Sequence, residues 1–384
     1  MATAPTTPPA APMAPAFGLS PEQEATLELA DKFGRAELAP LARRMDDEEW
    51  WPPEVFPKLG RAGLLGVTIP ASEGGPGIEL FSSALILQGL SRWNQAVGLS
   101  WLAHENLCVN NILRNGSAEQ RRRYLPGLAD GTKVGALALT EPGAGSDAIG
   151  SMAATARREG DHYVLKGRKL YITNGPIADV ILVYAKTAPE QGARGISAFL
   201  VEKGFPGFSV AQKLIKMGCR GSPTGELVFD DCRVPVANRM GAENAGVAVL
   251  MSGLDLERAV AAAISVGAAE RLLELSLAYA RERKQFGRPI AEFQMIQAKL
   301  ADMYVGVETM KGLSYKALAA VNDLEAGAGG RGEVHKLCAA ALLHAAEACS
   351  KTLATSQAAP SLLCQCMASA GSLMRARTLS RQKS

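Results

Sequence analysis

The sequence lacks an uninterrupted apolar run of the roughly 18 to 20 residues that a membrane-spanning helix requires, so we expect no membrane partner. It also lacks a surplus of charge, because 41 basic and 38 acidic residues are interspersed and leave a net charge of +3. No concentrated positive field is available to hold a polyanion. Nucleic acid is therefore not an expected partner.

Cysteine and histidine are also scarce. The seven cysteines are odd in number and mostly far apart, which suits a reducing compartment better than a disulfide framework. Cys364 and Cys366 form a CxC pair, but none of the four histidines lies at ligand spacing from it, so no metal site is expected. The first basic residue is Lys32, so residues 1–17 lack the charges of a secretion signal or a mitochondrial transit peptide. We expect a cytoplasmic protein of a bacterium.

The 384 residues, 47% of them apolar, are enough for two or three domains that share one body. The texture changes from helical to β-rich after Thr132 and returns to helical from Gly246. The expected fold class is α+β. The predicted divisions are a disordered Pro/Ala-rich tail (1–17), an N-terminal α-helical domain (18–132), a middle antiparallel, barrel-like β-domain (133–242), a C-terminal helical bundle (243–350) and a divergent tail (351–384).

Local signals place individual elements. Ser20 and Pro21 form an N-cap and a first helical position, which predicts a helix start. Gly160, within residues 159–162, can adopt positive φ and predicts a hairpin turn. Short β-rich runs predict strands at 163–165, 180–184, 196–201 and 227–229. An apolar stripe predicts a long amphipathic helix whose apolar face is core or subunit interface. The stripe consists of Ile296, Leu300, Met303, Val307 and Met310.

Residues 137–147 (LALTEPGAGSD) join a strand-like run to a glycine-rich turn that ends in a hydroxyl and a carboxylate. Such a turn can bring backbone N–H groups close to a pyrophosphate or to the edge of a ring. An ordinary turn capped by Ser146 or Asp147 would have the same composition. The loop alone therefore leaves both interpretations open.

Further segments carry a family resemblance. The 137–147 run fits the first signature of the acyl-CoA dehydrogenases, and residues 170–175 (LYITNG) fit that family's flavin-stacking strand. The match continues in residues 216–222, 228–235 and 283–289. Over roughly residues 20 to 350 the chain thus resembles the acyl-CoA dehydrogenase family, which implies that fold and a bound FAD.

The resemblance also implies which residues contact the cofactor. Those in the middle domain are Leu137, Leu139, Thr140, Gly145, Ser146, Tyr171, Ile172 and Thr173. Family members usually have tryptophan at the position of Tyr171, and either ring offers a flat apolar surface to a flavin. Arg283, Phe286 and Gln294 are implied to reach the FAD of a neighbouring subunit, so a homotetramer is implied. Composition alone favours a solvated cation at Arg283.

Residues 250–258 (LMSGLDLER) resemble the isovaleryl-CoA dehydrogenases, a subgroup that keeps its catalytic glutamate on this helix. The resemblance implies that Glu257 is the catalytic base. No Asp or Glu follows Glu347, so the tail cannot supply a carboxylate in its place. The alternative for Glu257 is a surface glutamate paired with Arg258 or with a residue one turn away.

The implied function is FAD-dependent α,β-desaturation of a short branched acyl-CoA, isovaleryl-CoA to 3-methylcrotonyl-CoA in leucine catabolism, with electrons passed to electron-transferring flavoprotein. The residues implied to contact the acyl-CoA are Ser146, Arg194, Asp255, Leu256 and Arg258. Another branched acyl-CoA such as citronellyl-CoA, or oxygen as acceptor, stays open. So does a non-catalytic relic, because the family's second signature is missing after about Ser350.

Overall fold

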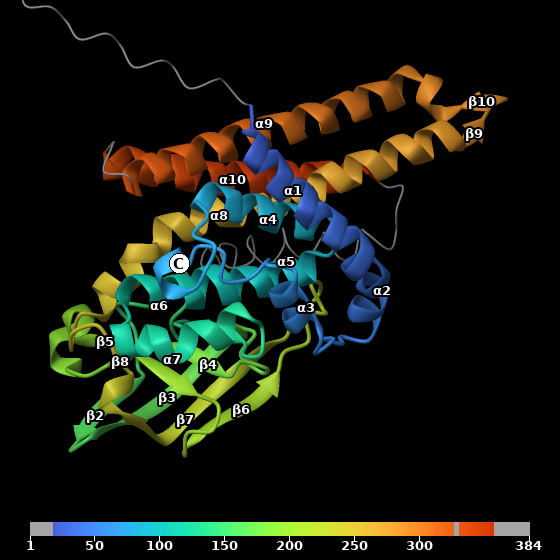
Figure 1. The fold of residues 1–384 in the computed structure, drawn as a ribbon. Helices are drawn as coiled ribbons and strands as arrows, with labels where there is room; N and C mark the ends of the chain where they lie inside the picture. Colours follow the sequence, from blue (N-terminus) through green and yellow to red (C-terminus); the bar gives the residue numbers. More distant parts are fainter. Residues whose placement is uncertain (1–17, 326–329, 357–384) are drawn as a thin grey trace, which may run out of the picture.

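The computed structural model describes residues 18–325 and 330–356 in three layers, with a sheet at one end, short helices in the middle and three long helices at the other end (Figure 1). The predictions for residues 1–17 and for the Cys364–Cys366 pair lie outside the described residues, as does most of the divergent tail. Of the described helices, none has both the length and the apolar content needed to cross a bilayer.

The N-terminal elements are α1 (Pro21–Phe33), the π-helix η1 (Gly34–Leu38), α2 (Ala39–Asp47), α3 (Val55–Arg61), η2 (Ala71–Glu73), α4 (Leu80–Trp93), α5 (Gln95–Leu102), the π-helix η3 (Ala103–Val109), α6 (Asn110–Asn115) and α7 (Ala118–Ala129). The predicted helix start is confirmed, because Ser20 Oγ accepts from Gln23 N at 3.2 Å and the Gln23 side chain accepts from Ser20 N at 2.9 Å. This capping box satisfies backbone groups that a helix end leaves unpaired. The middle of α4 is buried on all sides between α1 and α8.

The sheet contains β1 (Gly135–Ala138), β2 (Thr155–Glu159), β3 (His162–Thr173), β4 (Val180–Lys186), β5 (Ile196–Glu202), β6 (Phe208–Lys213), β7 (Thr224–Pro235) and β8 (Arg239–Met240), with η4 (Pro189–Gly195) and η5 (Val236–Asn238) between strands. The order is β6-β7-β3-β2-β4-β5-β8, with β1 paired to β4. All four predicted strands form, and Gly160 makes the β2–β3 turn with φ of +62°.

Most strand pairs of this sheet are antiparallel, as expected, but two are parallel. β1 runs parallel to β4, with Gly135 opposite Val180, and β2 makes one parallel pair with β4 through Thr155 and Lys186. The β2–β3 hairpin lies between β1 and β4 in the chain, so β4 returns in the direction of β1. Both pairings are long-range and leave no signal in the local alternation of residues.

The C-terminal elements are α8 (Gly246–Glu282), β9 (Lys284–Gln285), β10 (Arg288–Pro289), η6 (Ile290–Glu292), α9 (Gln294–Glu325) and α10 (Arg331–Thr355). α8 starts beside the sheet and crosses to the far end of the molecule (Figure 1). From the apolar stripe of α9, Met303, Val307 and Met310 are buried against α8 and α10, whereas Ile296 and Leu300 are partly buried. The predicted helix and its core face are confirmed.

Candidate active site

Helix α8 carries the predicted base, Glu257, and three predicted substrate contacts, Asp255, Leu256 and Arg258. Because a helix turns once in 3.6 residues, Asp255 and Arg258 share one face, while Glu257 lies above Gly253 on another. Arg258 Nη1 donates to Asp255 Oδ1 at 3.2 Å, so its ion-pair partner is Asp255. Glu257 therefore does not form the surface pair with Arg258 that composition alone would suggest.

Glu257 faces the helical layer that contains α6. Its Oε1 atom is shielded from solvent and has no hydrogen-bond partner among the described residues. A Cβ on Gly253 would lie 3.5 Å from Asn111 Oδ1 and 3.6 Å from Glu257 Oε1, so the two side chains meet over this glycine. Burial raises the pKa of Glu257 to about 7, while the charge of Arg258 and hydrogen bonding by Asn111 oppose the rise.

Tyr184, on β4, approaches the same carboxyl from the sheet. It is fully buried, and within the described residues its hydroxyl has no partner. Burial raises the pKa of Tyr184 well above its ordinary value, and the charges of Glu257 and Cys108 add to the rise. Sequence analysis does not single out Asn111 or Tyr184. A lone hydroxyl within the otherwise apolar run 180–185 is the one signal that could have indicated Tyr184.

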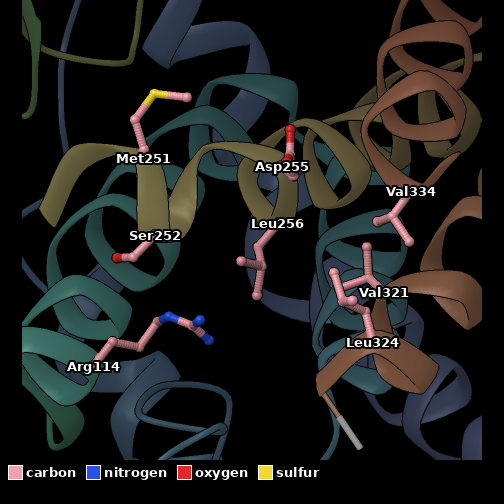
Figure 2. A pocket seen from close by; sticks show the side chains of 8 residues that line it. All are labelled: Arg114, Met251, Ser252, Asp255, Leu256, Val321, Leu324 and Val334. Carbon is pink, nitrogen blue, oxygen red and sulfur yellow. The ribbon is translucent and has the colours of Figure 1, made fainter. Parts of the chain in front are cut away.

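A cavity of about 510 Å³ opens beside this part of α8. It is lined by Arg114, Met251, Ser252, Asp255, Leu256, Val321, Leu324 and Val334 (Figure 2). The volume is within the usual range for small-molecule sites, and the lining combines aliphatic side chains with a few polar groups, as such sites do. The cavity brings together Asp255 and Leu256, two of the predicted substrate contacts. Glu257 adjoins it through the next position of the helix but does not line it.

Asp255, which lines this cavity, also links α8 to α10. His335 Nδ1, on α10, lies 2.7 Å from Asp255 Oδ1, the oxygen that also accepts from Arg258. Val334, the neighbour of His335, lines the cavity. The wall that faces α8 is therefore held by a polar contact as well as by packing. Nothing in the local sequence around His335 indicates this contact.

A buried ion pair anchors the predicted flavin loop, residues 139–147. Lys169 Nζ, on β3, donates to Glu141 Oε1 at 2.8 Å and to the Leu139 carbonyl at 3.0 Å. The Glu141 carboxylate also accepts from the backbone N–H groups of Ala153 at 2.6 Å and Ala154 at 3.1 Å. Three segments of the middle domain are thus joined at one carboxylate.

Two residues after Lys169, strand β3 bulges at Tyr171. Leu170 N donates to the Thr140 carbonyl at 2.8 Å, the pairing with β7 shifts between Lys169 and Ile172, and Tyr171 has φ of +61°. The bulge leaves Tyr171 64% exposed, while Ile172 is buried and Thr173 is half-buried. The strand thereby presents a flat aromatic side chain beside the glycine-rich loop.

The other predicted cofactor and substrate residues divide into two groups. Leu137, Leu139 and Thr140 are partly buried, and Gly145 and Ser146 are exposed, all on β1 or the loop after it. The residues of the second group are exposed: Arg194 lies in η4, and Arg283, Phe286 and Gln294 lie around the β9–β10 hairpin. Figure 1 shows that hairpin at the far end of the long helices, away from the sheet.

Comparison with known proteins gives consistent matches over the whole described fold. Residues 20–132, 136–232 and 244–354 match the N-terminal, middle and C-terminal domains of acyl-CoA dehydrogenase, respectively. The mitochondrial isovaleryl-CoA dehydrogenase of Pongo abelii is 45% identical over 334 residues, covering 86% of this chain and 77% of that protein.

Solved structures agree. The glutaryl-coenzyme A dehydrogenase in complex with glutaryl-CoA superposes with a TM-score of 0.85 at 33% identity, covering 92% of this chain and 91% of that one. A chain from the structure described as the electron transferring flavoprotein of Acidaminococcus fermentans superposes with a TM-score of 0.86 at 36% identity, covering 95% and 94%. This chain therefore belongs to the acyl-CoA dehydrogenase family, whose members are FAD flavoproteins and oxidoreductases.

Proposed function

We propose that this protein desaturates a short branched acyl-CoA, isovaleryl-CoA in leucine breakdown, with Glu257 as the base that removes the α-proton. The observation that carries the proposal is a carboxyl with an unpartnered, solvent-shielded oxygen on the helix that also lines the cavity. Structural carboxylates at such depth are normally paired, so an unpartnered one indicates a functional role.

The residues around Tyr171 fit a flavin. The exposed aromatic ring offers a stacking surface, and a Cβ at Gly143 or Gly145 would meet no atom within 4 Å, so a ligand can approach the loop backbone there. Thr140 and Thr173 would supply polar contacts on either side of the ring. Bound FAD supplies the acceptor for the hydride that leaves the β-carbon.

The remaining chemistry depends on the chain's own groups. The α-proton of a thioester is far less acidic than a carboxylic acid, so the base must be strengthened and held in place. Burial strengthens the base, because it raises the pKa of Glu257 to about 7 while leaving the group largely ionised at slightly alkaline pH. Helix α8 holds the base in place, because it fixes Glu257 next to Leu256 and Asp255. We propose that these two residues contact the thioester arm.

Exposed apolar side chains on the β9–β10 hairpin and α9 support a proposal for assembly. Phe286 is 94% exposed, and Met295, Tyr304 and Val305 are also large exposed apolar side chains of this hairpin and α9. We propose that this surface packs against other subunits in a homotetramer, where Arg283, Phe286 and Gln294 reach a neighbour's FAD. Electron-transferring flavoprotein is the proposed acceptor. The expected bacterial cytoplasmic location stays a prediction.

The test is anaerobic titration of the purified protein with isovaleryl-CoA, butyryl-CoA and citronellyl-CoA while flavin absorbance is recorded. We expect yellow protein whose flavin is bleached fastest by isovaleryl-CoA. Glu257→Gln should bind the thioester without bleaching, whereas Glu119→Gln, exposed on α7, should behave as the wild type. Fastest bleaching by citronellyl-CoA would show that the proposed substrate is wrong. Protein purified without flavin colour would support the non-catalytic alternative.

A further inference from the structure

Asn111 is a buried polar residue with no role in the proposed proton and hydride transfers. It lies on α6 and is 1% exposed. Its Nδ2 donates to the carbonyl of Leu107, one turn earlier, at 3.0 Å. That bond fixes the rotation of the amide, so its remaining N–H and its Oδ1 are held in one orientation. Among the described residues, Oδ1 has no hydrogen-bond partner.

The free side of this amide lies against α8 next to the base. A Cβ on Gly253 would lie 3.4 Å from Asn111 Nδ2, 3.5 Å from Asn111 Oδ1 and 3.6 Å from Glu257 Oε1. Gly253 and Glu257 are four residues apart, so they lie on the same face of the helix. The amide and the carboxyl therefore meet in the gap that the missing side chain of Gly253 leaves.

We propose that Asn111 is a positioning residue for the catalytic base, and that its anchored amide holds the Glu257 carboxyl over Gly253 throughout the reaction. This inference rests on the proposed role of Glu257. An amide suits the task because it carries both donors and an acceptor. The spare N–H can donate to the ionised carboxylate, and Oδ1 can accept from the carboxyl once it has received the proton from the substrate α-carbon.

The ionisable groups near Glu257 are Arg258 and Tyr184. Arg258 is paired with Asp255. Tyr184 stays neutral because burial raises its pKa well above the ordinary value, and the side-chain hydrogen bond that lowers the pKa of Glu257 comes from Asn111. Asn111 is therefore the neutral group whose hydrogen bond to Glu257 carries the proposal, and its amide can serve both protonation states of the base.

The test is the rate of flavin reduction by isovaleryl-CoA, measured anaerobically by stopped flow between about pH 6 and 9. Asn111→Leu removes a hydrogen bond to a charged group, so we expect the limiting rate to fall about 10- to 100-fold. We also expect the acid limb to move upward by about one pH unit, because the ionised base loses a donor. Asn111→Gln, which keeps the amide, should restore part of the rate and return the limb toward its original position.

Gly253→Ala distinguishes a positioning role of Asn111 from a purely structural one. The added methyl would be in ordinary van der Waals contact with both side chains, and alanine favours a helix more than glycine does. We expect a melting temperature equal to or above that of the wild type, together with flavin reduction about 10-fold slower, because the methyl occupies the gap where the amide and the carboxyl meet.

Glu257→Gln separates the two proposals. If it abolishes flavin reduction while Asn111→Leu and Gly253→Ala keep the wild-type rate and pH profile, the positioning role is wrong and the base assignment stands. If Asn111→Leu does not fold, the rate of Gly253→Ala decides in the same way. If Glu257→Gln reduces its flavin normally, both proposals are wrong.

Discussion

The buried pair of Lys169 and Glu141 gives a prediction whose size can be worked out from its contacts. The two side chains are 0% and 4% exposed, so neither charge is solvated by water. Lys169→Met leaves the Glu141 carboxylate buried with only two backbone N–H donors, from Ala153 and Ala154. Removing one partner of a buried pair costs about 3–5 kcal/mol, a large share of the roughly 5–15 kcal/mol by which most domains are stable.

The second variant tests the cause. In Lys169→Met with Glu141→Gln, no uncompensated charge remains, and the amide oxygen can still accept from one backbone N–H. We therefore expect this double variant to recover about half of the lost free energy of unfolding. Because the pair supports the loop beside Tyr171, both variants should also be purified with less FAD than the wild type.

The assay is urea unfolding followed by far-UV circular dichroism, together with the ratio of flavin to protein absorbance. Lys166→Met is the matched control, because Lys166 is exposed on the same strand and its replacement should change stability by less than about 0.5 kcal/mol. A free energy of unfolding for Lys169→Met within about 1 kcal/mol of the wild type, or a double variant no more stable than the single one, would show that the pair does not stabilise the fold in this way.

Three further predictions concern the base and the helices around it. The rate of flavin reduction should fall as pH drops below about 7, because burial raises the pKa of Glu257 to about 7 and the protonated carboxyl cannot accept a proton; a flat profile from about pH 5.5 to 8 would contradict this. Glu105→Ala should cost at least about 2 kcal/mol in urea unfolding, because its carboxylate accepts from two buried backbone N–H groups at residues 66–67, at 2.9 and 2.8 Å. His335→Gln should cost less than about 1 kcal/mol, because the half-exposed ring makes a solvent-screened contact with Asp255; a larger loss would mean that this contact holds α10 in place.

Local signals in the sequence were sufficient for several elements. The Ser20 cap and the Gly160 turn each depend on conformational preferences of a few adjacent residues, and both form as predicted. The apolar stripe of α9 likewise reports its own buried face, because helical periodicity is a property of one segment. The parallel pairing of β1 with β4 is different, since it depends on contacts between distant parts of the chain.

The candidate site shows the same division. Glu257 was predicted from the motif around it and from the absence of acidic residues after Glu347, both of which are visible in the sequence. Asn111 and Tyr184 reach that carboxyl only because α6, β4 and α8 pack together, and neither residue has a distinctive neighbourhood of its own. The Lys169–Glu141 pair was missed for the same reason, because nothing in either segment indicates that its charge is buried.

The π-helix η3 has a consequence for the phase of the helices that follow it. A turn with i→i+5 bonding contains one residue more than an α-helical turn, so every later residue is rotated by about 100° relative to an uninterrupted α-helix. Asn111 is the second residue after this irregular stretch. Deleting one residue between Ala103 and Val109 would allow a regular helix and turn the Asn111 amide away from α8. The insertion of one residue into this helix is thus what brings the amide into phase with the glutamate opposite.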